Sequence, residues 1–194
     1  MISKIKEKAK NWLIWSQRYT RTDMLYLAKG GFWLSGGQIL GTLSSFLLAL
    51  AFANLVDKNI YGTYKYIISL ASGLGALTLT GMNTAVTRAV ASGAEGTLKK
   101  SVIYQLKWNI ILFAAAIGVG FYYWLHGNNV IAIAMILVGI LSPFINTTNT
   151  YMAYLNGKKD FRRMAFYGAA INILVTIVLV VTMIINKNVL WLVF

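Results

Sequence analysis

The sequence predicts an all-α membrane protein, a polytopic bundle of helices, and three observations predict it. Hydrophobic residues make up 58% of the 194 residues and charged residues only 12%, against roughly 45–50% and about 25% in ordinary soluble domains. The mean hydropathy is +0.63. Several apolar stretches also reach the length of about 20 residues that a helix needs to cross the hydrocarbon layer.

Five stretches are long enough to be full transmembrane helices, separated by short loops rich in Asn, Gly, Lys and Asp. A sixth apolar run begins at Val189 and reaches only Phe194, which is too short to span. We therefore expect a transmembrane bundle over residues 30–194, with five full helices and the start of a sixth. The five spans are predicted at about residues 30–56, 61–80, 102–125, 129–155 and 164–185.

Residues 1–29 precede the first span and are predicted to form a basic amphipathic segment on the cytoplasmic interface. Several apolar side chains share one helical face here, and lysines flank that face on both edges. A disordered basic tail is the alternative. The segment lacks the small-residue cleavage site of a signal peptide.

The distribution of basic residues predicts the orientation. The chain has 18 Lys and Arg against 5 Asp and Glu, a formal net charge of +13. All the basic residues except Lys58, Lys65 and Lys187 belong to the N-terminal segment or to the loops after the second and fourth spans and the helix ends beside those loops. Because basic residues stay on the cytoplasmic side, the N-terminus is predicted to be cytoplasmic. Anionic membrane lipids are the expected partners of this charge, and no nucleic acid is expected, because a nucleic-acid module would carry less apolar sequence.

The acidic residues argue against an enzyme. All five lie outside the apolar interior of the spans, in the tail, the loops or the helix ends: Glu7, Asp23, Asp57, Glu95 and Asp160. The chain has one histidine, His126, in a predicted turn, and no cysteine. Since acid–base and metal-dependent chemistry needs carboxylate, imidazole or thiolate groups, we expect no catalytic residues, no metal and no cofactor.

Two lysines near the ends of spans are candidates for a substrate cavity. Lys65 lies about one turn into the second span, on a face of small and hydroxyl residues. Its amine either lines a wet cavity or extends to the outer interface, and both interpretations are open. Lys107 lies early in the third span beside Tyr104 and Trp108, where extension to the cytoplasmic interface is favoured.

Arg88 is a third cationic candidate. Residues 61–92 are longer than one span needs, and Gly81 predicts a break after which residues 82–91 continue as a second helical piece. Arg88 would then lie near the inner mouth of the bundle, where its guanidinium is suited to bidentate binding of a diphosphate. An ordinary cytoplasmic anchor explains it equally well.

The fourth span combines a proline with an unusually polar stretch. Pro143 removes one helical hydrogen bond, and Asn146-Thr147-Thr148-Asn149-Thr150 follows. Asn146 and Asn149 share a face and must contact protein or water, because unpaired amides in lipid are costly. Binding of sugar hydroxyls and hydrogen bonding between helices are both open. In the first span, Gly37, Gly41 and Ser45 form a row of small residues that predicts a helix contact.

Short sequence motifs in and around the second span, and after the fourth, resemble those of a known family. These motifs are Tyr61-Gly62, the break at Gly81-Met82-Asn83-Thr84-Ala85, Val86-Thr87-Arg88-Ala89-Val90, the loop Ala94-Glu95-Gly96-Thr97-Leu98, and Leu155-Asn156-Gly157-Lys158-Lys159-Asp160-Phe161. With these motifs, roughly residues 20–186 resemble the N-terminal part of bacterial polysaccharide and oligosaccharide flippases. That family belongs to the superfamily of multidrug, oligosaccharidyl-lipid and polysaccharide exporters.

The resemblance implies a protein of the bacterial inner membrane that flips undecaprenyl-diphosphate-linked oligosaccharide by alternating access. Family members have 12 to 14 helices in two bundles around a basic cavity, so this chain would supply the N-terminal bundle and need a C-terminal half or a partner chain. The resemblance places Arg88 at the lipid diphosphate and, on position alone, Lys65, Asn146 and Asn149 in the cavity. A multidrug or lipid II exporter of the same superfamily, and a small membrane scaffold without transport activity, are the alternatives.

Overall fold

The computed structural model describes residues 14–15, 24–186 and 189–193, and it contains helices and no strand within these ranges. The helices are α2 (Met24–Leu55), α3 (Lys58–Gly75), α4 (Met82–Ala91), α5 (Thr97–Leu125), α6 (Asn129–Gly157), α7 (Phe161–Ile185) and α8 (Val189–Val193). The predicted basic segment over residues 1–29 lies almost entirely outside the described residues.

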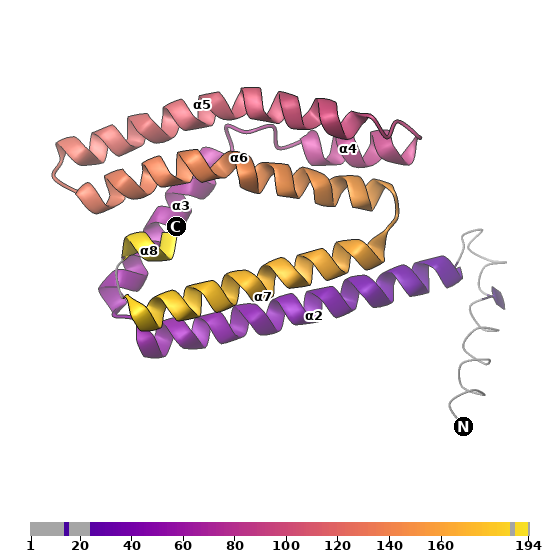
Figure 1. Ribbon diagram of the computed structural model, residues 1–194, viewed down its shortest axis with the longest axis horizontal. Helices are drawn as coiled ribbons and strands as arrows, with labels where there is room; N and C mark the ends of the chain where they lie inside the picture. Colours follow the sequence, from indigo (N-terminus) through magenta and orange to yellow (C-terminus); the bar gives the residue numbers. More distant parts are fainter. Residues whose placement is uncertain (1–13, 16–23, 187–188, 194) are drawn as a thin grey trace.

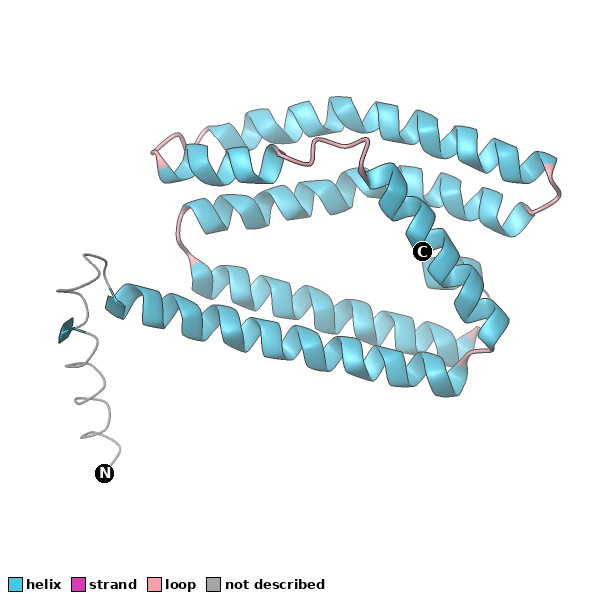
Figure 2. Ribbon diagram, turned by 180° about the vertical axis from the view of Figure 1, so that it is seen from behind, coloured by secondary structure: helices cyan, strands magenta, loops and turns pink. Residues whose placement is uncertain are grey.

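The long helices form two pairs, as Figure 1 shows. Helices α2 and α7 pack side by side in parallel, and α5 packs antiparallel against α6. The short α4 lies against α5 and α6 at one end, while α3 and α8 lie between the two pairs toward the other end. Seen from behind in Figure 2, the start of α2, the α4–α5 loop and the α6–α7 loop again lie at the same end. We call this the basic end, because eight of the eleven Lys and Arg residues that the structure describes lie in or beside these segments: Lys29, Arg88, Lys99, Lys100, Lys158, Lys159, Arg162 and Arg163.

Small residues bring α2 and α7 close together. A Cβ atom built at Gly37 would lie 3.2 Å from Cβ of Ala165, and one at Gly41 would lie 3.2 Å from Nδ2 of Asn172. The prediction that Gly37 and Gly41 form a helix contact is therefore confirmed. The α5–α6 pair uses the same device, since a Cβ at Gly120 would lie 3.0 Å from the carbonyl oxygen of Ala132.

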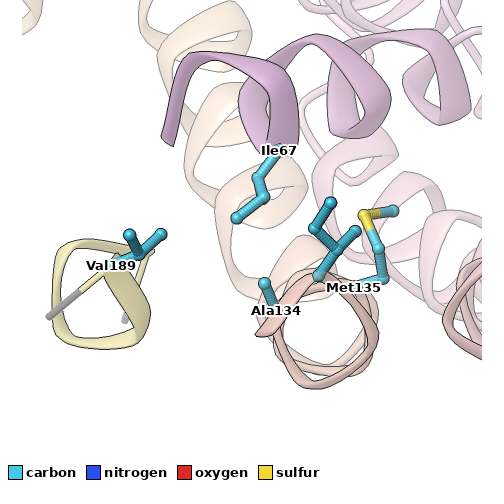
Figure 3. Packing of buried hydrophobic residues seen from close by; sticks show 5 residues of the cluster. Ile67, Ala134, Met135 and Val189 are labelled. Atoms are coloured by element: carbon cyan, nitrogen blue, oxygen red, sulfur yellow. The ribbon is translucent and has the colours of Figure 1, made fainter. Parts of the chain in front are cut away.

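A cluster of buried apolar side chains holds α3 and α8 against the α5–α6 pair. Ile67 of α3 meets Ala134 and Met135 of α6, and Val189 of α8 packs against the same cluster (Figure 3). Ile67, Ala134 and Met135 are fully buried. This contact anchors one face of α3 at Ile67 on the α5–α6 pair, and the rest of this amphipathic helix is exposed or half-buried.

The predicted break at Gly81 is confirmed. Helix α3 ends at Gly75, a turn follows, and α4 begins at Met82 and ends at Ala91. Residues 58–91 therefore form two helices and a connection, where the sequence predicted one span over residues 61–80 followed by a short helical piece.

Four helices are long and apolar enough to cross a membrane, at Ala28–Leu55, Thr97–Leu125, Asn129–Gly157 and Phe161–Ile185. Helix α3 does not join them, because its 18 residues include two lysines and several Ser and Gly residues and are too polar on average. The predicted count of five spans and the start of a sixth is thus not confirmed among the described residues. The last apolar run appears as the five-residue helix α8.

Candidate functional site

One set of polar side chains that face a common space surrounds Arg88 at the basic end. This Arg88 cavity has a volume of about 490 Å³ and lies between α4 and α6, with α7 contributing one residue. It is lined by Asn83, Thr84, Thr87, Arg88, Asn149, Met152, Ala153, Asn156 and Met164. The structure therefore brings together Arg88 and Asn149, two of the residues singled out by the sequence.

Arg88 is positioned by a tight contact between α4 and α6. Val86 and Val90 are buried against Ala153 on one side of α4. The hydroxyl of Thr87 donates to the carbonyl oxygen of Ala153 at 3.0 Å, which ties the two backbones together. These contacts leave Arg88 on the other side of α4, exposed along the cavity.

The close approach of the two helices depends on Gly157, the last residue of α6. A Cβ there would lie 2.7 Å from both the carbonyl oxygen of Thr87 and Cβ of Val90. Such distances are too short for any side chain, so glycine is required at this position for α4 to pack as it does.

The chemistry of the Arg88 cavity is that of an anion site with hydroxyl-binding groups around it. Arg88 supplies a guanidinium, while Asn83, Asn149 and Asn156 supply amides. None of the lining residues is acidic. A guanidinium can bind two phosphate oxygens at once, and amides can both donate to and accept from sugar hydroxyls.

A second group of polar side chains lies deeper, between α5 and α6. Thr150 is fully buried, and its hydroxyl lies 2.7 Å from Oε1 of Gln105. Nδ2 of Asn146 donates to Oδ1 of Asn109 at 2.9 Å. The predicted alternative of hydrogen bonding between helices is therefore confirmed for Asn146.

This group encloses a small cavity of about 60 Å³, which we call the amide cavity. Asn109 is only 4% exposed, and its Nδ2 atom has no hydrogen-bond partner among the described residues. The space is large enough for ordered water, which would satisfy this donor. Asn83 lines both the amide cavity and the Arg88 cavity, so the two are neighbours.

The two lysines that the sequence suggested as cavity residues lie outside both cavities. Lys65 is exposed on α3, with its amine 5.5 Å from the centre of the Tyr61 ring. Lys107 is exposed on α5. Neither lines the Arg88 cavity or the amide cavity. The interface interpretation fits both lysines better than the cavity interpretation.

An ion pair joins the two loops beside the Arg88 cavity. Nζ of Lys158 lies 3.0 Å from Oε2 of Glu95, which connects the α4–α5 loop to the end of α6. A hydrogen bond with Tyr154 and the nearby Glu95 carboxylate raise the pKa of the Lys158 amine. Because both side chains are substantially exposed, the pair orients the loops more than it stabilises the bundle.

The sequence analysis did not identify the polar residues that α5 contributes to the cluster around the amide cavity. Ser101, Gln105 and Asn109 recur at intervals of four along α5 and form part of its buried face. Polar residues at helical spacing within an otherwise apolar span are the signal that could have identified them.

Known proteins do not assign this site. Comparisons of the chain with protein families, with characterised proteins and with solved structures find no match.

Proposed function

We propose that the chain is the N-terminal bundle of a transporter that moves undecaprenyl-diphosphate-linked oligosaccharide across the bacterial inner membrane. The observation that carries the proposal is the Arg88 cavity, where one guanidinium and several amides face a common space and no carboxylate competes for the cation. A lipid diphosphate needs such a cation, and the attached sugars need amide and hydroxyl partners.

The size of the site fits part of such a substrate. A cavity of about 490 Å³ accommodates a diphosphate with an attached sugar, and a longer glycan needs more space. A second bundle, from a C-terminal half or a partner chain, would close the cavity on its open side. The resemblance of residues 20–186 to oligosaccharide flippases supports this arrangement.

The proposed topology places the basic end in the cytoplasm. The start of α2, the two loops at this end and the helix ends beside them hold eight of the eleven Lys and Arg residues that the structure describes, which favours cytoplasmic exposure. For α2, α5, α6 and α7 to alternate in this way, α3 and α4 together must return the chain across the membrane as a broken second span. The cavity then faces the side on which lipid-linked sugars are assembled.

The test is glycan export in a bacterial strain that lacks its own flippase, with the complete coding sequence supplied. Arg88→Ala is expected to reduce export about 10- to 100-fold, the effect of losing a charge-assisted hydrogen bond pair, while the protein still inserts into the membrane. Arg88→Lys should retain part of the export. Lys99→Ala, which removes an exposed cation of α5 outside the cavity, is the matched control.

The result also separates the alternatives. Normal export by inserted Arg88→Ala and Asn149→Ala proteins would contradict the proposal and favour a scaffold without transport activity. Loss of drug efflux with intact glycan export would favour a multidrug exporter instead.

A further inference from the structure

A second basic cavity, apart from the Arg88 cavity, lies between the N-terminal part of α2 and the segment that joins α6 to the first turn of α7. Its volume is about 310 Å³. Lys29 and Trp33 of α2 line it together with Lys159, Asp160 and Arg162 from the start of α7. We call it the α2–α7 cavity.

The charges of the α2–α7 cavity are mostly positive. Among the lining residues that the structure describes, three are cationic, Lys29, Lys159 and Arg162, and one is acidic, Asp160. The Asp160 carboxylate accepts a hydrogen bond from the backbone N–H of Arg163 at 3.1 Å, and its other oxygen lies 3.3 Å from Nε of Arg163. Since Arg163 does not line the cavity and already balances this acid, the cavity has an excess of positive charge.

Arg162 lies over the indole ring of Trp33 at the edge of the cavity. Its guanidinium carbon lies 5.4 Å from the centre of the Trp33 ring. Stacking on an indole restricts the guanidinium while leaving N–H groups at its edge available to oxygen ligands. A preoriented guanidinium is suited to a phosphate group.

The position of the cavity along the helices corresponds to the edge of the hydrocarbon layer. The apolar segments Ala28–Leu55 and Phe161–Ile185 both begin at this point. Phe161 packs on Gly30, where a Cβ would lie 2.6 Å from its ring, and this contact brings the two helix starts together. Phe32 and Phe166 are 74% and 68% exposed on the same two helices, on surfaces suited to acyl chains.

We infer that the α2–α7 cavity binds the phosphate headgroup of an anionic phospholipid. The excess of cations selects a lipid of net negative charge, Arg162 binds the phosphate oxygens, and Trp33 lies at headgroup depth. A zwitterionic headgroup fits less well, because its own cation would face the three basic side chains. The inference stands apart from the proposed transport function, since it uses neither Arg88 nor Asn149.

The test measures lipid retention by the purified full chain with native mass spectrometry, after addition of phosphatidylglycerol or phosphatidylcholine. The wild-type protein is expected to retain phosphatidylglycerol preferentially. Lys29→Gln/Arg162→Gln is expected to weaken that retention about 10- to 30-fold. Lys99→Gln/Lys100→Gln, which removes the same charge from the exposed start of α5, is expected to leave it largely unchanged.

Three outcomes would overturn the inference. Equal retention of both lipids would show that charge does not select the ligand, and equal losses in the two double variants would show diffuse attraction by the whole basic end. Displacement of phosphatidylglycerol by inorganic phosphate at equal concentration would assign the site to a free anion. Thermal unfolding of each variant in phosphatidylcholine nanodiscs checks that it is folded, and Trp33→Leu, which keeps every charge, should also weaken retention.

Discussion

Asn146 in α6 donates a hydrogen bond from Nδ2 to Oδ1 of Asn109 in α5 at 2.9 Å, and Nδ2 of Asn109 is buried with no hydrogen-bond partner in the part of the chain that the structure describes. This pair joins the two helices that line the deeper polar region. It also shows that the polar stretch after Pro143 serves the packing of the bundle at Asn146, while Asn149, three residues on, faces the Arg88 cavity.

Replacing one of these two asparagines should lower the free energy of unfolding more than replacing both. Asn109→Leu leaves Nδ2 of Asn146 without its acceptor, and we expect a loss of about 0.6 to 2 kcal/mol in the free energy of unfolding. Asn109→Leu/Asn146→Leu should recover part of it, because no unpaired amide remains. Unfolding in detergent measures the double-mutant cycle. A coupling energy of zero would contradict the hydrogen bond.

Substitution of Gly157 should displace α4. Gly157→Ala places a Cβ 2.7 Å from Thr87 and Val90, and we expect a destabilisation of about 1–3 kcal/mol together with reduced glycan export. Gly168→Ala is the control, because a Cβ at this α7 position meets no atom within 4 Å and alanine is the better helix former. Equal melting temperatures of the two variants would show that α4 does not pack against Gly157.

The two exposed lysines should be dispensable for transport. Lys65→Gln and Lys107→Gln are expected to change glycan export by no more than about twofold, because exposed charges outside the cavities contribute little. Arg88→Gln in the same assay is the positive control. A loss at Lys65 as large as that at Arg88 would mean that the functional cavity extends along α3.

The Lys158 amine, which pairs with the ionised Glu95 carboxylate, should hold its proton to a higher pH than an ordinary lysine. Because its pKa is raised above the usual 10.5, the amine's contribution to the pair is lost as the pH rises through the raised value. The pH dependence of acylation at Lys158, followed by mass spectrometry, measures this pKa directly. Tyr154→Phe should lower it more than Glu95→Gln does, and an unchanged midpoint in both variants would contradict the contacts.

The sequence by itself determined the all-helical architecture and the approximate limits of the four apolar helices. Long apolar runs leave no other way to satisfy the backbone in a bilayer, and Gly, Asn and Lys loops end each helix. The break at Gly81 and the presence of a helix contact at Gly37 and Gly41 were also predictable from the sequence, whereas the partner helix α7 was not. The sequence also pointed to Arg88 and Asn149, but it left Lys65 open between cavity and interface and named Lys107 as a further candidate, although the interface was favoured for Lys107.

Only the tertiary structure decided between these candidates. Whether a cation in a helix faces a cavity or the outside depends on how the helix is rotated against its neighbours, and contacts between residues far apart in the chain set that rotation. The packing of Val90 against Gly157 orients α4 so that Arg88 lines the same cavity as Asn149. The burial of Ile67 orients α3 so that Lys65 faces outward. Helical periodicity fixes which residues share a face, and packing fixes what that face contacts.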